Sequence, residues 1–165
     1  RQMCIRDRLD VPIELVAAGS ERAFGAARWR WLHPEPGRLH RRLNDTSTVI
    51  RVEAAGRALL LCGDIEREAM AQLLGAPDVL HADVMELPHH GGTHGPLAEA
   101  FVDAVDPLIV VQSTGRRRWN RDRWCEALEP RVRLVTARDG AAWIEIDSSG
   151  VMSWGATIDS SGAPP

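Results

Sequence analysis

Short apolar runs alternate with polar turns along most of the chain, and their spacing separates expected strands from expected helices. Runs of apolar and β-branched residues that end at Gly, Pro or Asp are typical of strands, whereas apolar residues at intervals of three and four indicate helices. The pattern predicts helices over residues 65–74, 96–105 and 124–128. It predicts strands over residues 11–17, 28–32, 48–52, 58–62, 84–87, 108–111, 132–135, 141–146 and 151–154.

The order of these elements predicts the fold class. Two hairpins are expected, one over residues 48–62 that turns at Gly56, and one over residues 141–154 that turns at 148–150. Between the hairpins, strands alternate with helices, which is typical of layered α/β proteins. We therefore expect an α/β fold.

The composition limits the classes of protein to consider. The chain has 165 residues, 44% of them hydrophobic, which suits one domain with an apolar core. No apolar run reaches about eighteen residues, so no membrane segment is expected, and no signal-peptide pattern is present. The net charge of -3 gives no argument for nucleic acid. Cys4, Cys62 and Cys125 lack the spacing of a disulfide framework or a thiolate zinc site.

The two ends of the chain differ in character from the rest. Residues 1–8 look like a non-native leader, and residues 159–165 are a Ser/Gly/Pro-rich tail that we expect to be disordered. Residues 9–158 form the expected domain.

Three histidines follow the strand predicted over residues 84–87. Pro88 ends that strand, and His89, His90 and His94 lie in the glycine-rich turn after it. Neutral imidazole is a common metal ligand, and loops that a rigid strand positions often carry chemistry. The alternative is a polar turn without a ligand.

A carboxylate follows an earlier strand in the same way. Asp64 comes directly after the strand predicted over residues 58–62, and the segment 44–47 lies at the entry of its hairpin partner. Asp64 and the imidazoles of His89 and His90 can share divalent metal if these strand ends meet. As an alternative, Asp64 caps the helix that follows it.

A basic segment lies between two predicted strands, at residues 116–124. Arg116, Arg117, Arg118 and Trp119 belong to it, together with two further arginines and a second tryptophan. Guanidinium groups bind phosphates, and tryptophan rings stack on bases, so this segment is a candidate contact for nucleic acid. The alternative is a solvated loop whose tryptophans pack inward.

The order of three motifs resembles the C-terminal half of the metallo-β-lactamase-like domain of ComEC-type competence proteins. The motifs are N-D-x-S at 44–47, G-D-I-E at 63–66 and P-H-H-G at 88–91, and the resemblance covers roughly residues 28–146. It implies part of an αββα sandwich, whose second half is a mixed β-sheet with helices on one face. It also implies two divalent metal ions, zinc or manganese, and hydrolysis of phosphodiester or similar bonds in DNA uptake.

The resemblance assigns roles to particular residues. It makes Asp64 the bridging metal ligand and the pair His89 and His90 the late metal-ligand motif, with His89 slightly preferred. Asn44 and Ser47 match the strand-entry motif at the edge of the site. Asn120 matches a further family position near the site, and His94, from the histidine turn itself, is a further candidate at the site's edge.

Two departures from the family pattern change the expectation. Gly92 stands where the family usually has Ser. The His-x-His-x-Asp-His motif, which supplies most ligands in the family, is absent, and an N-terminal truncation would explain its absence. We therefore expect the missing N-terminal half of the domain to be a partner of this chain. Alone, the chain should bind metal weakly or not at all and should be inactive.

Two functions thus remain as hypotheses. In the first, the parent protein is a metal-dependent phosphodiesterase or nuclease, either an inner-membrane protein with this domain in solution or a free-standing relative. In the second, the chain is a non-catalytic nucleic-acid-binding or interaction module that uses residues 116–124.

Overall fold

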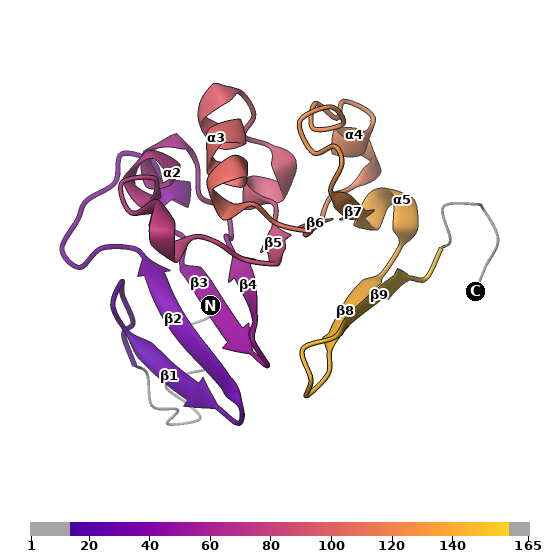
Figure 1. Cartoon of the computed structure of the whole chain (residues 1–165). Helices are drawn as coiled ribbons and strands as arrows, with labels where there is room; N and C mark the ends of the chain where they lie inside the picture. Colours follow the sequence, from indigo (N-terminus) through magenta and orange to yellow (C-terminus); the bar gives the residue numbers. More distant parts are fainter. Residues whose placement is uncertain (1–13, 159–165) are drawn as a thin grey trace, which may run out of the picture.

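The computed structural model describes residues 14–158, in which the strands form a seven-stranded sheet and a separate two-stranded hairpin (Figure 1). The sheet follows chain order from β1 to β7, with antiparallel pairing from β1 to β4 and parallel pairing from β4 to β7. Its strands are β1 (Glu21–Phe24), β2 (Ala27–His33), β3 (Val49–Ala54), β4 (Arg57–Leu61), β5 (Val84–Glu86), β6 (Ile109–Gln112) and β7 (Val132–Val135). Because β4 to β7 are parallel, the segments that follow them all leave from the same edge of the sheet.

The helices are short. They are α2 (Arg67–Leu73), α3 (Pro96–Val105), α4 (Arg116–Trp119) and α5 (Thr136–Asp139), with single 3-10 turns at Asn44–Thr46, Pro77–Val79 and Pro88–Gly91. The longest described helix, α3, has ten residues, about half of what a bilayer requires, so no helix within residues 14–158 can cross a membrane.

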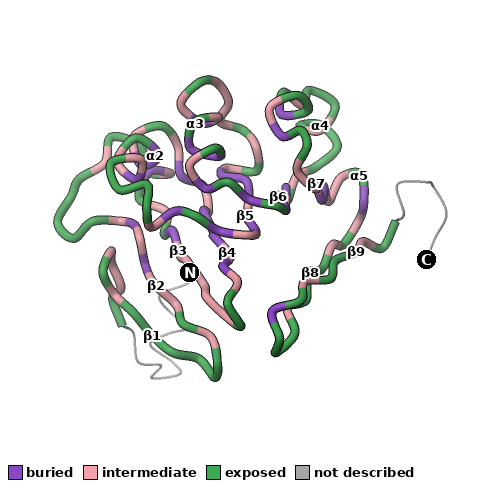
Figure 2. The backbone as a smooth tube through the Cα atoms, viewed as in Figure 1, coloured by how far each residue is buried: buried purple, intermediate pink, exposed green. Residues whose placement is uncertain are grey.

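The main core lies between the sheet and the helices α2 and α3, which cover one of its faces (Figures 1 and 2). α3 buries Ala98, Phe101, Val102 and Val105, an apolar stripe at intervals of three and four. Cys62, immediately after β4, is completely buried in this core. Burial raises the pKa of the Cys62 thiol well above its ordinary value of 9.0.

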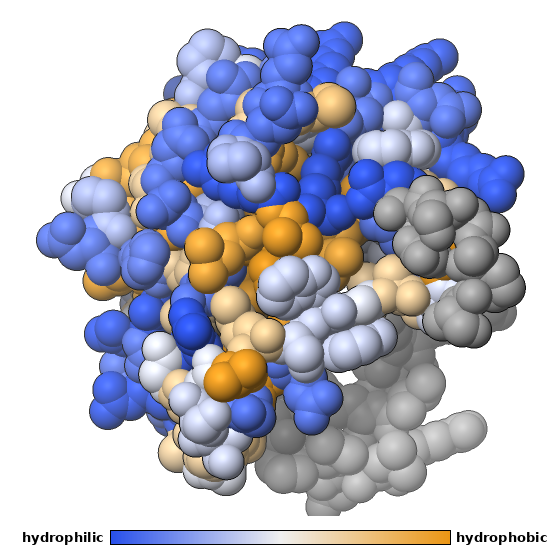
Figure 3. All heavy atoms as spheres, turned by 45° about the vertical axis from the view of Figure 1, so that its right-hand side comes forward, coloured by the Kyte–Doolittle hydropathy of each residue, from blue (hydrophilic) through white to orange (hydrophobic). Residues whose placement is uncertain are grey.

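The hairpin of β8 (Ala142–Ile146) and β9 (Met152–Ala156) covers part of the opposite face. Ile144 and Met152 pack there against a second, smaller core in β5, β6 and β7. The strand register places further apolar residues of β2, β3 and β4 on this face, and they are only half-buried: Trp29, Ile50, Val52, Leu59 and Leu61. When the side carrying the hairpin is turned forward, hydrophobic residues gather across the middle of the molecule, below a mainly hydrophilic upper part (Figure 3).

The predicted fold class is confirmed: the chain has an α/β fold with a mixed sheet and its main helices on one face. The helix predicted at 96–105 and the strand predicted at 132–135 have these bounds in the structure, and both hairpins are present. The predicted leader 1–8 and tail 159–165 lie outside the described residues.

Other predicted elements were wrong. Residues 14–17 of the strand predicted at 11–17 have no regular structure, and its first three residues are not described. The segment 124–128 is a series of turns with one helical bond, from Leu128 N–H to Trp124 O (3.1 Å). Pro130 disfavours helical continuation at the preceding residue, and the burial of Trp124 fixes the start of the segment. The short elements β1, α4 and α5 were not predicted.

Candidate functional site

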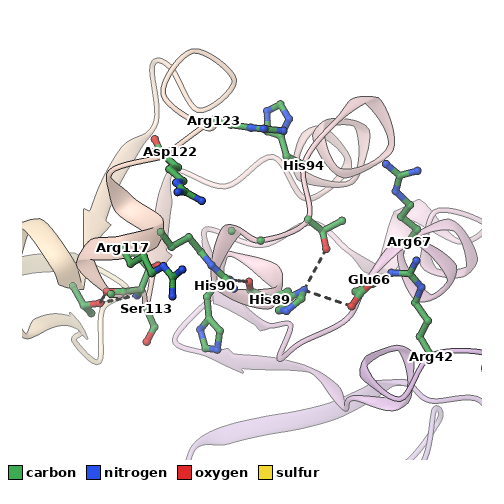
Figure 4. A pocket seen from close by; sticks show the side chains of 18 residues that line it. Arg42, Glu66, Arg67, His89, His90, His94, Ser113, Arg117, Asp122 and Arg123 are labelled. Carbon is green, nitrogen blue, oxygen red and sulfur yellow. Dashed lines mark hydrogen bonds and ion pairs between the residues drawn. The ribbon is translucent and has the colours of Figure 1, made fainter.

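A cleft of about 1090 Å³ lies at the edge of the sheet where the parallel strands end (Figure 4). Its walls come from the histidine turn and the residues after it, from the segments that follow β6 and β7, and from three residues near α2. The residues near α2 are Arg42, Glu66 and Arg67. Of the segments predicted from sequence to converge, the histidine turn lines this cleft, whereas Asp64 and residues 44–47 do not.

The histidine turn has an unusual backbone. His89 (φ 50°, ψ 38°) and His90 (φ 57°, ψ 25°) are both in the left-handed region, and Gly91 follows with φ 76°. For a residue with a side chain, this region costs about 1 kcal/mol or more. The consequence of the turn is that the two imidazoles diverge: His89 points toward Glu66, and His90 points away from it (Figure 4).

His90 is the imidazole that meets Asp64. Its Nε2 lies 3.4 Å from Asp64 Oδ1, and the two side chains are 47% and 45% exposed. The backbone N–H of His89 donates to Gly63 O (2.9 Å), which ties the turn to the end of β4. A carboxylate and an imidazole thus converge from separate strand ends as the sequence predicted, but the partner of Asp64 is His90, whereas the resemblance slightly favoured His89.

His89 has a different carboxylate partner, Glu66, which was not predicted from sequence as a site residue. His89 Nδ1 lies 3.7 Å from Glu66 Oε1 and 3.5 Å from Thr93 Oγ1. Asn44 Nδ2 donates to Glu66 Oε1 (2.9 Å), and Arg42 donates to the other carboxylate oxygen. Burial raises the pKa of Glu66, but these two hydrogen bonds and the nearby positive charge of Arg42 together outweigh it, so the net shift of the pKa is downward and Glu66 is ionised at neutral pH.

The N-D-x-S segment also fixes the backbone of Glu66. Asp45 is buried, and its Oδ1 accepts hydrogen bonds from the N–H groups of Glu66 (2.8 Å) and Ala69 (3.0 Å). Asp45 therefore caps α2, the role that the sequence left open for Asp64. A Cβ atom built on Gly63 would lie 3.4 Å from Ser47 Cβ, so Ser47 packs closely behind the G-D turn.

The other predicted positions fall into two groups. His94 lines the cleft, with its Nε2 3.4 Å from Glu99 Oε1. Asn120 is exposed at the end of α4 and does not line the cleft.

Of the predicted nucleic-acid contacts, Arg117 and Arg118 line the cleft, whereas Arg116 and Trp119 do not. The Trp119 ring is packed against guanidinium groups, with Arg133 Cζ 5.3 Å and Arg138 Cζ 5.6 Å from its centroid. This ring is therefore occupied by the protein itself.

The cleft carries an excess of positive charge. Its two acidic residues, Glu66 and Asp122, are each paired with an arginine. Four lining arginines have side chains that make no ion pair or hydrogen bond with any residue of the described range: Arg67, Arg117, Arg121 and Arg123. Such a surface favours a ligand with several negative charges.

The side chains at the sheet edge that could bind metal come in pairs. Across residues 14–158, no three His, Cys, Asp or Glu side chains converge in a way that would hold a metal ion. A complete site for an ion such as zinc takes three or four protein ligands. The described residues alone therefore do not complete a metal centre.

Comparison with known proteins gives two sequence relatives, and no protein-family model matches the chain. Competence protein ComA of Neisseria gonorrhoeae is 32% identical over 136 residues, which cover 78% of this chain and 19% of that protein. ComE operon protein 3 of Bacillus subtilis (strain 168) is 30% identical over 73 residues, 44% of this chain and 9% of that protein.

Among solved structures, a crystal structure described as a Zn-dependent hydrolase of the metallo-β-lactamase superfamily, from Thermotoga maritima, aligns with a TM-score of 0.40 and 12% identity. The alignment covers 70% of this chain and 68% of that one. The chain spans a fifth or less of the length of the two sequence relatives. On the sequence matches, the chain is similar to a segment of these two competence proteins.

Proposed function

We propose that this chain forms part of the active site of a hydrolase domain that cleaves phosphodiester bonds during DNA uptake. The observation that carries the proposal is the approach of Asp64 and His90 to 3.4 Å at the edge of the sheet, beside a cleft with four arginines that have no side-chain partner within residues 14–158. The arginines suit a phosphodiester substrate because guanidinium groups bind phosphate. The Asp64–His90 pair suits it because a carboxylate and an imidazole can bind the metal of a hydrolase.

In this proposal Asp64 and His90 supply two ligands of a centre with two divalent ions, zinc or manganese. The remaining ligands come from another part of the same domain, because the described residues offer only pairs of donors. When bound, such ions provide a hydroxide at neutral pH and polarise the phosphoryl oxygen.

The other residues act on the substrate. The cleft arginines hold the phosphate groups and orient the ester bond at the sheet edge. His89 lies on the cleft wall with the ionised Glu66 beside its Nδ1, so its ring is oriented to exchange a proton with a phosphate ester oxygen.

The test is hydrolysis of a 5′-labelled single-stranded oligonucleotide by the whole gene product that carries this chain, with Mn²⁺ or Zn²⁺ supplied. Asp64→Asn should reduce the rate at least about 100-fold, because even the outer partners of metal ligands are worth up to that factor. Asp78→Asn is the control, since Asp78 is an exposed carboxylate that does not line the cleft. Unchanged hydrolysis and metal content in Asp64→Asn would refute the proposal.

A second candidate function is non-catalytic binding of nucleic acid. The four cleft arginines without a side-chain partner in the described part of the chain favour it, and it requires no metal. In chelator, Arg117→Ala, Arg121→Ala and Arg123→Ala together should weaken oligonucleotide binding and lower the slope of log K against log salt by about 2, or about 0.7 per phosphate contact.

The matched control is the triple variant Arg22→Ala, Arg28→Ala and Arg38→Ala, which removes the same charge from residues outside the cleft. If both triple variants weaken binding equally, the cleft is not the binding site. If binding depends on the cleft but the whole gene product never hydrolyses the oligonucleotide, this second function replaces the first.

A further inference from the structure

The segment from Gln112 to Trp124 holds the histidine turn through its carbonyl groups. Each of the three left-handed residues of the turn accepts a hydrogen bond from a different side chain. The bonds run from Arg118 Nη1 to His89 O, from Gln112 Nε2 to His90 O (3.1 Å) and from Trp124 Nε1 to Gly91 O (3.0 Å). We propose that Gln112, Arg118 and Trp124 are positioning residues that set the directions of the His89 and His90 imidazoles.

The energetics of the turn require such partners. Two residues with side chains occupy a region that is unfavourable by about 1 kcal/mol or more each, so the surrounding structure must compensate. A change to extended backbone would turn the carbonyls away from their donors and leave buried polar groups unpaired. The three hydrogen bonds therefore favour the one backbone conformation that directs His89 toward Glu66 and His90 toward Asp64.

Gln112 is itself held in one orientation. It is 1% exposed, and its Oε1 accepts a hydrogen bond from Arg133 Nη2. Arg133 also makes a bidentate pair with Asp122, with N–O distances of 2.7 and 2.8 Å. Burial raises the pKa of Asp122, but the hydrogen bonds and positive charge of Arg133, together with backbone hydrogen bonds, outweigh it and the net shift of the pKa is downward, so this pair is charged at neutral pH. Since its oxygen is engaged by a cation, the amide of Gln112 must present its N–H group to His90 O.

The other two donors are also restricted. Trp124 is 1% exposed, and its indole meets the His94 ring edge-on with centroids 5.2 Å apart. Arg118 lies against Gly92, where a Cβ atom would come within 2.7 Å of its Nη1 and 2.9 Å of His89 O. A glycine at position 92, where the family pattern has serine, therefore leaves room for the bond from Arg118 to the turn.

The experiment is NMR spectroscopy of the 165-residue chain without metal. Three variants each remove one donor: Gln112→Glu, which keeps an acceptor for Arg133, Arg118→Met and Trp124→Phe. The nuclear Overhauser effects (NOEs) between the His90 ring and Asp64 and between the His89 ring and Glu66 report the directions of the imidazoles. The backbone couplings of both histidines report φ.

Each variant should lose at least one of these ring NOEs and change the coupling of the histidine nearest the lost donor. The amide shifts of β3 and β4 should stay as in the parent chain, which shows that the fold is intact. Trp31→Phe is the control, because Trp31 is 9% exposed and its indole donates to no described residue. Unchanged NOEs and couplings in the exposed Arg118→Met variant and in Gln112→Glu would overturn the proposal, as would equal losses in Trp31→Phe.

The positioning role rests on the proposed function only in the chemical task that it gives to the two imidazoles. The NMR test does not depend on hydrolytic activity. If the NOEs are lost as expected but Asp64→Asn hydrolyses normally, the positioning role stands and the hydrolase assignment fails. If the NOEs persist while Asp64→Asn is inactive, the hydrolase assignment stands and the positioning role fails.

Discussion

Within the histidine turn, Gly91 occupies a position where a side chain would not fit. Its φ is 76°, and a Cβ atom would lie 2.5 Å from Gln112 Nε2 and 3.0 Å from Leu87 Cδ2. A side chain at this position would push Gln112 away from the carbonyl of His90. Gly91 therefore combines a backbone requirement with a packing requirement.

These two requirements can be separated by a matched pair of variants. Gly56 has the same φ, 76°, with no atom within 4 Å of a Cβ position. Gly56→Ala should lower the free energy of unfolding by about 1 kcal/mol, from backbone strain alone. Gly91→Ala adds overpacking and should lower it by about 2–4 kcal/mol. Urea denaturation measures both, and equal losses would show that Gln112 yields without cost.

His33 makes stability depend on pH. It is fully buried, and its Nε2–H donates to Asp45 O (2.7 Å), with the His40 ring 4.9 Å away between centroids. Burial lowers the pKa of His33 below its ordinary value of 6.5, and the positive charge of a protonated His40 acts in the same direction. The hydrogen bond to Asp45 O and the carboxylates of Asp45 and Glu35 raise the pKa by less.

The unfolded chain therefore binds this proton at a higher pH than the folded chain. The free energy of unfolding should be highest above pH 6.5 and should fall as the pH drops from 6.5 toward the lowered pKa. His33→Gln keeps a donor for Asp45 O and should flatten this dependence in urea denaturation between pH 5 and 7.5. His81→Gln, at an exposed position, should retain it. Identical profiles in all three proteins would exclude His33 as the cause.

Among the elements, α2 depends on a cap from outside its own segment. Asp45 supplies that cap from the turn before β3, and the same turn presents Asn44 to Glu66. The helix start and the carboxylate beside His89 are thus fixed together.

Loss of this cap should be measurable. Asp45→Ala leaves the N–H groups of Glu66 and Ala69, at the start of α2, without their partner and should lower the free energy of unfolding by about 2–3 kcal/mol. Asp78→Ala removes an exposed carboxylate and should change it by less than about 0.5 kcal/mol. A similar small effect for both would mean that water satisfies the start of α2.

The elements that the sequence predicted well are those with a strong apolar period. α3 has four buried residues on one stripe, and the β3–β4 hairpin joins two apolar strands at Gly56. The missed elements, β1, α4 and α5, have four residues each, too few for a period to be distinguishable. The false helix at 124–128 had helical spacing, but its apolar residues are buried for another reason, the contact of Trp124 with the histidine turn.

For the molecule as a whole, strand order was enough to predict that Asp64 and the histidines converge. It was not enough to say which imidazole would face Asp64, because left-handed histidines are set by tertiary hydrogen bonds that leave no local signal. Glu66 was missed for the same reason: its role depends on Asn44, 22 residues earlier. The packing of Trp119 against Arg133 was equally hidden.

The side chains available to bind metal predict how tightly the chain binds it. With two donors per pair in the described residues, we expect the 165-residue chain to bind Zn²⁺ no more tightly than about 1 μM, far below a four-ligand site worth about 10–16 kcal/mol. Calorimetric titration of tag-free protein measures this. His90→Gln should weaken binding further, and His81→Gln should not. Two tightly held ions in the parent chain would contradict the expectation.

The buried thiol of Cys62 can be used to measure the local opening of the end of β4. Cys62 precedes the Gly63–Asp64 turn and is completely buried, whereas Cys125 is exposed. An alkylating reagent should therefore modify Cys125 at once and reach Cys62 only during excursions that detach the end of β4 from the core. The ratio of the Cys62 and Cys125 labelling rates therefore measures how often the end of β4, which precedes Asp64, opens.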